Sequence, residues 1–234
     1  MSLLWQNRSK GDMSLANVFD IIGPIMIGPS SSHTAGAVRL GMIARALLGE
    51  SPSNAEIKLH GSFARTYKGH GTDKALIAGL LGFAPDDLRI RDSLQLAKEQ
   101  GLSYTFEPVD LGDLHPNTAL IDLESASGKT LSMLGSSVGG GKVRIHQVNG
   151  LPAEFTAQYD TLIVYHRDTP GVIATVTNIL ASHHMNIGQM RVYRSHRGGR
   201  SVIVLETDEQ VDENLCQQVR AVSNVTGVMF LHAL

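Results

Sequence analysis

The sequence predicts an α+β protein of two domains, a mixed α/β domain followed by a ferredoxin-like domain with the order β-α-β-β-α-β. Glycine usage divides the chain, because 19 of the 24 glycines lie in residues 1–150 and only five follow. From Tyr159 onward, short β-branched runs alternate with segments of helical periodicity, the order of a split β-α-β fold. We therefore place the domains at residues 13–150 and 159–234, with a linker at residues 151–158.

The first 150 residues open with a polar stretch and continue as the mixed domain. Residues 1–12 show no periodicity, and we expect them to be a disordered extension or a tag. The elements of the mixed domain follow from apolar spacing, with glycine-rich turns between them. The predicted helices are residues 35–48, 73–81 and 90–100, and the predicted strands are residues 55–59, 104–106 and 119–123.

The second domain is predicted more sharply. Residues 162–166 are rich in β-branched side chains, which indicates a strand. Val172, Val176 and Leu180 then recur at helical spacing, and this helix ends before Asn186. The remaining elements are strands at residues 187–193, 201–207 and 228–231 and a helix at residues 211–222.

Composition and charge exclude several classes of protein. The content of 42% hydrophobic and 18% charged residues is typical of a globular domain. The net charge of −2 offers no general attraction to nucleic acid or to an anionic membrane, so neither is expected as a partner. No apolar run is long enough to span a bilayer, and no signal core is evident, which favours a cytoplasmic location.

Cysteine usage limits the metal chemistry of the chain. The only cysteine, Cys216, lies in a predicted helix, so an intrachain disulfide is excluded. One thiolate cannot by itself hold a structural zinc or an iron–sulfur cluster. We interpret Cys216 as a packing residue and predict no metal site within this chain.

The first motif is Gly28-Pro-Ser-Ser-Ser-His-Thr34, at the start of the predicted helix 35–48. Backbone N–H groups at a helix start and nearby hydroxyls together suit a carboxylate or phosphate. A helix cap is the alternative, but it needs one hydroxyl, whereas this motif has four and an imidazole. Its candidate residues are Ser30, Ser31, Ser32, His33 and Thr34.

The second motif combines His60-Gly-Ser62 with Thr66-Tyr-Lys-Gly-His-Gly-Thr-Asp73, between a predicted strand and a predicted helix. Strand-to-helix turns often carry ligand-binding groups in α/β proteins. His60 and Asp73 are the candidates here. The alternative is a glycine loop capped by Thr72 or Asp73, with His70 in solvent.

The third motif, His115-Pro-Asn-Thr118, places an imidazole and an amide on a segment made rigid by proline. His115 suits proton transfer, and Asn117 suits hydrogen bonding to a developing oxyanion. A turn with a hydrogen-bonded histidine would explain the motif equally well.

The fourth motif, Ser136-Ser-Val-Gly-Gly-Gly-Lys142, contains three consecutive glycines beside a cationic side chain. Such backbone allows an anion to approach closely, with Ser137 and Lys142 as contacts. A flexible hairpin tip is the alternative.

These four motifs, in this order, resemble the β chain of bacterial iron–sulfur-dependent L-serine dehydratases, and the resemblance covers residues 13–234. It implies an N-terminal domain of the serine-dehydratase β type, similar to the allosteric-substrate-binding domain of some phosphoglycerate dehydrogenases. It also implies that residues 159–234 form an ACT domain, in agreement with the β-α-β-β-α-β order.

The resemblance implies that L-serine is converted to pyruvate and ammonia at a site completed by a separate α chain, whose cysteines hold a 4Fe–4S cluster. His60 or His115 is then the proton carrier, and hydroxyls of the first motif bind the substrate carboxylate. The implied catalytic residues are His33, His60, Asp73, His115 and Asn117, and the implied substrate contacts are Ser30, Ser31, Ser32, Thr34, Ser137 and Lys142.

The ACT-like half has two possible roles. The resemblance implies an amino-acid effector bound at a homodimer contact by Asp168, Gly171, Asn186 and Ile187. Alternatively, this half only joins subunits. A rival function for the whole chain is a non-catalytic amino-acid sensor like the tail of a phosphoglycerate dehydrogenase, and a metal-dependent hydrolase ranks last because no tight ligand spacing is present.

Overall fold

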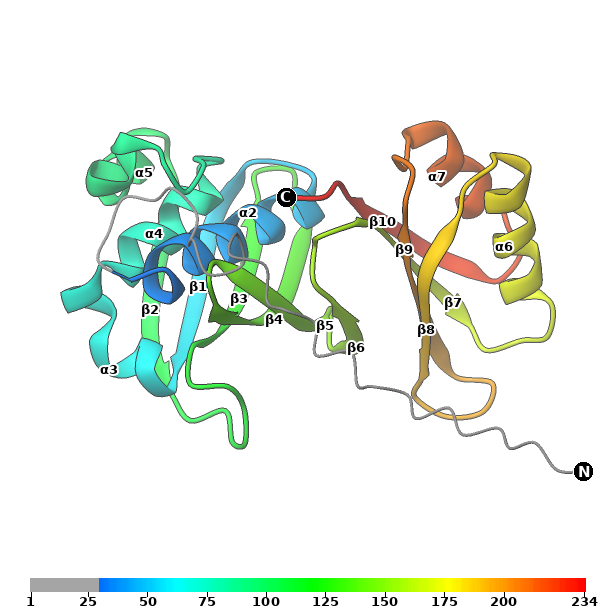
Figure 1. The fold of residues 1–234 in the computed structure, drawn as a ribbon, viewed down its shortest axis with the longest axis horizontal. Coiled ribbons are helices and arrows are strands. Elements are labelled where there is room, and N and C mark those ends of the chain that lie inside the picture. Colours follow the sequence, from blue (N-terminus) through cyan, green and yellow to red (C-terminus); the bar gives the residue numbers. More distant parts are fainter. Residues whose placement is uncertain (1–29) are drawn as a thin grey trace, which may run out of the picture.

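A computed structural model describes residues 30–234, which form two sheets with their helices (Figure 1). The first sheet has the order β2-β1-β3-β4-β5-β6, and the second has the order β10-β7-β9-β8. The expected mixed α/β domain followed by a ferredoxin-like domain is confirmed. Residues 1–12, expected to be a disordered extension or a tag, lie outside the described residues, as do Gly28 and Pro29 of the first motif.

The first sheet is parallel at one edge and an antiparallel meander elsewhere. β1 and β2 are parallel, and each later strand pairs antiparallel with its neighbour. A helical crossover joins β1 to β2, as parallel strands require. The strands are β1 (Pro52–His60), β2 (Ser103–Val109), β3 (Thr118–Ser125), β4 (Thr130–Gly139), β5 (Lys142–Val148) and β6 (Leu151–Phe155).

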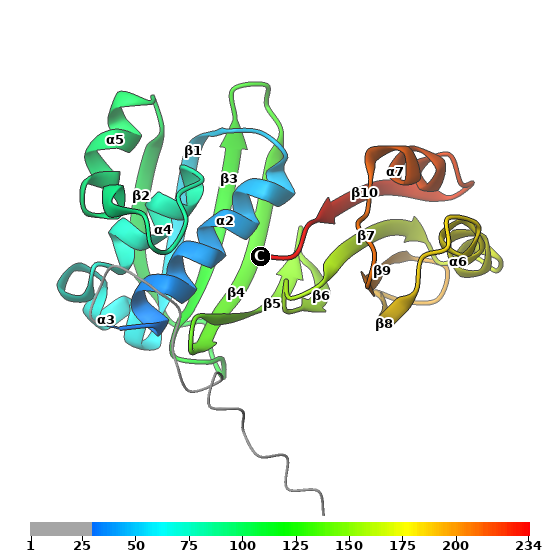
Figure 2. The same cartoon turned by 45° about the horizontal axis from the view of Figure 1, so that its top comes forward.

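Helices cover one face of this sheet (Figure 2). A π-helical turn at Ser32–Gly36 leads directly into α2 (Ala37–Leu48), which packs on β3 and β4. The crossover contains α3 (Gly61–His70), α4 (Thr72–Leu80), a 3₁₀ turn at Leu88–Asp92 and α5 (Ser93–Glu99).

Helices α2 and α4 cross at glycines. A Cβ atom at Gly41 would overlap the Leu76 carbonyl oxygen, and one at Gly79 would overlap that of Val38. The two backbones therefore approach more closely than any other residue at these positions would allow.

The structure differs from the sequence prediction in three segments. Residues 61–70 form a helix where a glycine-rich turn was expected, because Gly61 and Gly71 lie at its ends rather than within it. Strands β4 and β5 were not predicted, and they contain the fourth motif except for Gly140 and Gly141 in the turn between them. Residues 151–155, expected to be linker, form β6 at the edge of the first sheet.

The second domain has the predicted order of elements. It consists of β7 (Asp160–Arg167), α6 (Val172–Ser182), β8 (Ile187–Arg194), β9 (Arg200–Thr207), α7 (Glu213–Arg220) and β10 (Val225–Leu231). Because side chains alternate along a strand, Ile203 and Leu205 pack under the helices, whereas Val202 and Val204 pack with the first domain. Strands β7 and β9 are thus buried on both faces, whereas the edge strand β8 is mostly exposed. No helix within residues 30–234 is long and apolar enough to cross a membrane.

Candidate functional site

The four sequence motifs meet at one end of the first domain, where the start of the π-helical turn, the start of α3, the beginning of β3 and the end of β4 come together. His33 lies at the centre and is 7% exposed. Its Nδ1 is 3.3 Å from Ser30 Oγ. Its Nε2 is 3.4 Å from Ser62 Oγ and 3.2 Å from Thr66 Oγ1. Hydroxyls from two motifs therefore surround one imidazole.

His70, at the end of α3, also contacts His33. The two ring centroids are 4.8 Å apart in an edge-to-face arrangement. Burial, with a smaller contribution from the charge of His70, lowers the pKa of His33 below its ordinary value. His33 is therefore neutral near pH 7 and can accept a proton.

Lowering the pH is expected to destabilise the protein through His33. The unfolded chain binds this proton near pH 6.5, whereas the folded chain binds it only at lower pH. The contribution of neutral His33 to the free energy of unfolding is thus fully present above about pH 6.5 and is lost as the pH falls toward the pKa of His33 in the folded chain.

We expect the fall in melting temperature between pH 7.5 and pH 5.5 to be smaller in His33→Gln than in the parent. The exposed-site variant His196→Gln serves as a control, and a His33→Gln curve identical to that of the parent would refute this account.

The start of α3 joins the second motif to the third. The backbone N–H groups of Ser62 and Phe63 donate to the Pro116 carbonyl oxygen at 2.7 and 3.3 Å. A Cβ atom at Gly61 would lie 2.7 Å from the Pro116 backbone, so this close approach requires glycine. His60 and His115 are thereby brought to the same end of the sheet.

His60 and His115 have the same hydrogen-bonding pattern. The Leu111 N–H donates to His60 Nδ1 at 3.1 Å, and the Asn117 N–H donates to His115 Nδ1 at 3.2 Å. We assign the ring proton of each to Nε2, because an Nδ1 that accepts a hydrogen bond carries none. The His60 side chain is 12% exposed and lies 3.7 Å from an Asp110 carboxylate oxygen, whereas His115 is exposed.

Asn117 and Ser137 join the third motif to the fourth. The Ser137 N–H donates to the Asn117 carbonyl oxygen at 2.9 Å. Asn117 Oδ1 and Ser137 Oγ are both buried and lack a hydrogen-bond partner within residues 30–234. A Cβ atom at Gly36 would overlap the Ser137 hydroxyl, so the π-helical turn that carries the end of the first motif also packs here. Two unsatisfied buried polar atoms are costly, and at a functional site they indicate groups reserved for a ligand or a partner.

The structure adds His146, which sequence reasoning missed. Its Nε2 is 2.8 Å from Ser136 Oγ, which is 2.6 Å from Thr118 Oγ1. Thr118 in turn donates to the His115 carbonyl oxygen at 2.6 Å. Burial lowers the pKa of His146. The sequence signal that could have indicated His146 is the alternation of apolar and polar residues over 142–148, which is typical of a strand and is β5 in the structure.

The other predicted site residues of the first domain belong to the same four motifs but make fewer contacts with the groups described above. Ser31 immediately precedes the π-helical turn and Ser32 begins it, both half-buried, and Thr34 is buried within the turn. Asp73, in the first turn of α4, has its pKa raised by burial and accepts from the Lys74 N–H at 2.8 Å. Lys142 is exposed beside the turn of the β4–β5 hairpin. Within residues 30–234, neither Asp73 nor Lys142 hydrogen-bonds to His33.

The four predicted effector residues lie at opposite ends of the second sheet within one chain. Asp168 follows β7 and accepts from the Gly198 N–H at 3.0 Å. Asn186 precedes β8 and donates to an Asp208 carboxylate oxygen at 2.6 Å. The eight residues of β7 separate these ends by about 25 Å. Gly171 is near Asp168 and Ile187 is next to Asn186, so one chain does not bring the four together.

The part of the chain between residues 30 and 234 contains no group of three or more histidine, cysteine, aspartate or glutamate side chains placed to hold a metal ion. Cys216 is buried, and burial raises the pKa of its thiol to about 11. It therefore remains a thiol at neutral pH and suits packing rather than ligation.

Comparisons with known proteins agree with this architecture. A family model described as "Serine dehydratase beta chain" matches residues 17–107, and one described as "ACT domain" matches residues 161–224. The "Probable L-serine dehydratase, beta chain" of Bacillus subtilis is 42% identical over 216 residues, covering 92% of this chain and 98% of that protein.

Two further relatives are less similar than the Bacillus subtilis β chain. The "L-serine dehydratase, beta chain" of Peptoniphilus asaccharolyticus is 38% identical over 216 residues, covering 92% of this chain and 97% of that protein. A D-3-phosphoglycerate dehydrogenase of Bacillus subtilis is 23% identical over 196 residues, covering 83% of this chain and 37% of that protein.

Proposed function

The chain belongs to the family of L-serine dehydratase β chains, and from this membership we propose that it forms the β subunit of an enzyme converting L-serine to pyruvate and ammonia. The resemblance stated from the four motifs is thereby confirmed. The observation that supports a catalytic role is the meeting of the four motifs at one end of the first domain, where hydroxyls of two motifs surround His33 and where Asn117 Oδ1 and Ser137 Oγ are buried and unsatisfied within residues 30–234.

The 4Fe–4S cluster that the family implies does not fit this chain. The sequence contains one cysteine, and that cysteine is buried with a raised pKa, whereas such clusters are held by several thiolates. We propose that a cysteine-rich α chain holds the cluster and that the exposed His115 faces it. The elimination then takes place where the two chains meet.

This chain supplies groups for binding and proton transfer. Elimination removes a proton from Cα and releases the β-hydroxyl as water, and the resulting enamine hydrolyses to pyruvate and ammonia. His60 and His115 each rest with their proton on Nε2 and with Nδ1 accepting a backbone N–H. The ring that acts as proton carrier takes up the Cα proton by releasing that N–H, and the resulting imidazolium gives one proton to the departing hydroxide, which leaves as water. The hydroxyls around His33 suit the substrate carboxylate, and Asn117 can bind an oxyanion through its amide N–H groups.

Co-expression with the α chain tests this function. The purified chain alone is expected to form no pyruvate from L-serine, and co-expression under anaerobic conditions with a cysteine-rich α chain is expected to give a brown complex that does. Turnover by the isolated chain, or failure of the two chains to associate, would contradict the proposal.

The similarity to phosphoglycerate dehydrogenases supports a second candidate, a non-catalytic amino-acid sensor. Under this alternative, the chain binds an amino acid but associates with no cysteine-rich partner. The co-expression experiment therefore separates the two functions.

We also propose a homodimer contact through β8, an edge strand of the second sheet. Met190 and Val192 on this strand are 45% and 42% exposed. Antiparallel pairing of two β8 strands would continue the sheet and bring the Asn186 end of one copy toward the Asp168 end of the other. The four predicted effector residues would then come from two chains.

The double variant Met190→Lys/Val192→Lys is expected to shift the parent dimer to monomer, raising its dissociation constant at least tenfold, because two charges would be buried at the contact. Size-exclusion chromatography with light scattering measures the mass. Leu88→Lys, at a position 70% exposed on the first domain, is the matched control. A parent chain that is monomeric in complex with its α chain would argue against this contact.

A further inference from the structure

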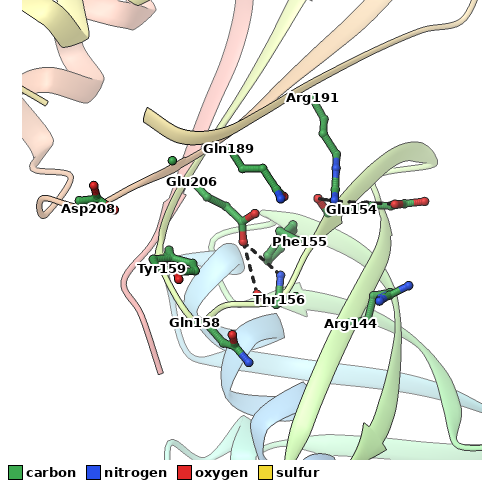
Figure 3. A pocket seen from close by; sticks show the side chains of 11 residues that line it. Arg144, Glu154, Phe155, Thr156, Gln158, Tyr159, Gln189, Arg191, Glu206 and Asp208 are labelled. Carbon is green, nitrogen blue, oxygen red and sulfur yellow. Dashed lines mark hydrogen bonds and ion pairs between the residues drawn. The ribbon is translucent and has the colours of Figure 1, made fainter. Parts of the chain in front are cut away.

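A cavity of about 390 Å³ lies between the two domains (Figure 3). One wall comes from β5, β6 and the residues just after β6, and the other comes from β8 and β9. Its volume is in the range of small-molecule sites, which commonly lie at domain interfaces. None of the predicted effector residues Asp168, Gly171, Asn186 and Ile187 lines it.

Glu206 is a buried carboxylate in this cavity. It follows Val202 and Val204 on the face of β9 that packs against the first domain, and it is 6% exposed. Its Oε1 accepts two long hydrogen bonds of 3.4 Å, from the N–H and the hydroxyl of Thr156. Within residues 30–234, no cationic side chain pairs with it. Because a buried charge is costly unless it is compensated, this carboxylate indicates a cationic ligand group.

Arg144 supplies the opposite charge. It lies on the exposed face of β5, lines the same cavity, and makes no hydrogen bond or ion pair within residues 30–234. Arg191 differs, since it donates to the Glu154 carbonyl oxygen at 3.0 Å and lies 3.7 Å from its carboxylate. Glu206 and Arg144 thus lie on walls from different domains, and neither pairs with an oppositely charged side chain within residues 30–234. Asp208, which also lines the cavity without a cationic partner, accepts a hydrogen bond from the Asn186 amide at 2.6 Å.

We propose that this cavity binds a small α-amino acid as a zwitterion, with its ammonium group on Glu206 and its carboxylate on Arg144. A simple cation would leave Arg144 without a partner, and a simple anion would leave Glu206 uncompensated. An α-amino acid carries both complementary charges in one small molecule. Gln189 and Tyr159, which also line the cavity, are placed to contact its side chain.

Such a ligand would connect the second domain to the candidate catalytic site. His146 lies two residues beyond Arg144 on the same face of β5, and its Nε2 is 2.8 Å from Ser136 Oγ. Glu154, another residue of the cavity wall, lies close enough to affect the charge state of His146. The inference goes beyond the proposed function and does not require it, since the cavity is formed by this chain alone.

Isothermal titration calorimetry on the full 234-residue chain, with L-serine as the probe, tests the proposal. We expect one site per chain, and we expect Glu206→Gln and Arg144→Gln each to weaken binding at least tenfold, as loss of a charge-assisted hydrogen bond would. Ethanolamine and glycolate, which each lack one charge, should bind at least tenfold more weakly than L-serine. Glu107→Gln and Arg197→Gln, both exposed, are the matched controls and should bind normally.

Two results would overturn the proposal. The first is the absence of binding at millimolar L-serine. The second is binding of L-serine that is abolished in Asn117→Ala and unchanged in Glu206→Gln, which would place the amino acid at the four-motif site.

A further measurement, of thermal stability, concerns the ligand-free chain. Glu206→Gln keeps the acceptor for Thr156 and removes the uncompensated charge, so its melting temperature should rise; a fall would mean that Glu206 serves the fold rather than a ligand.

Discussion

Asparagine at His60 or at His115 is expected to lower kcat of the α/β complex by about 100- to 10,000-fold, the usual contribution of a positioned proton carrier. Asparagine is informative here because its Oδ1 can replace Nδ1 as the acceptor for the Leu111 or Asn117 N–H. The local hydrogen bond is thereby kept, and only the titratable nitrogen that carries the proton is removed. Steady-state pyruvate formation under anaerobic conditions measures the effect.

His196→Asn is the control, because His196 is an exposed residue of the β8–β9 hairpin and should retain full activity. Circular dichroism and the yield of the brown complex show whether each variant folds and binds its partner. Normal turnover by both His60→Asn and His115→Asn would remove these histidines from proton transfer. A loss of complex formation without a loss of kcat per complex would assign them to the contact with the α chain instead.

The largest effect on stability is expected at the crossing of α2 and α4. Alanine at Gly79 places a Cβ atom into the Val38 carbonyl oxygen, and the backbones must separate. Overpacking of this kind typically costs about 1–3 kcal/mol, and here it acts on backbone rather than on a flexible side chain. The gain of about 1 kcal/mol in helix propensity offsets only part of that cost. We expect a lower urea midpoint for unfolding.

Gly69→Ala is a control of opposite sign. Gly69 is an exposed residue of α3, and a Cβ atom there meets nothing within 4 Å. Only the propensity gain remains, so its midpoint should rise. If Gly79→Ala were as stable as Gly69→Ala, the close approach of α2 and α4 would not be a determinant of stability.

The sequence by itself determined the second domain. Its strands and helices have distinct periodicities, and Gly171 and Gly198 lie in the turns where positive backbone φ angles occur. It also indicated the residues of the candidate site. His33, His60, His115 and Asn117 stand out because each lies in a local motif that can be read without knowing what packs against it.

The tertiary structure decided how these motifs combine. Ser62 and Thr66 reach His33 because residues 61–70 form a helix. The glycines of this segment had instead predicted a turn. His146 joins the site only through the pairing of β4 with β5, and Glu206 meets the cavity only where β9 faces β6. Periodicity reports how a segment turns, but contacts between distant residues depend on strand order and domain packing, which local sequence does not encode.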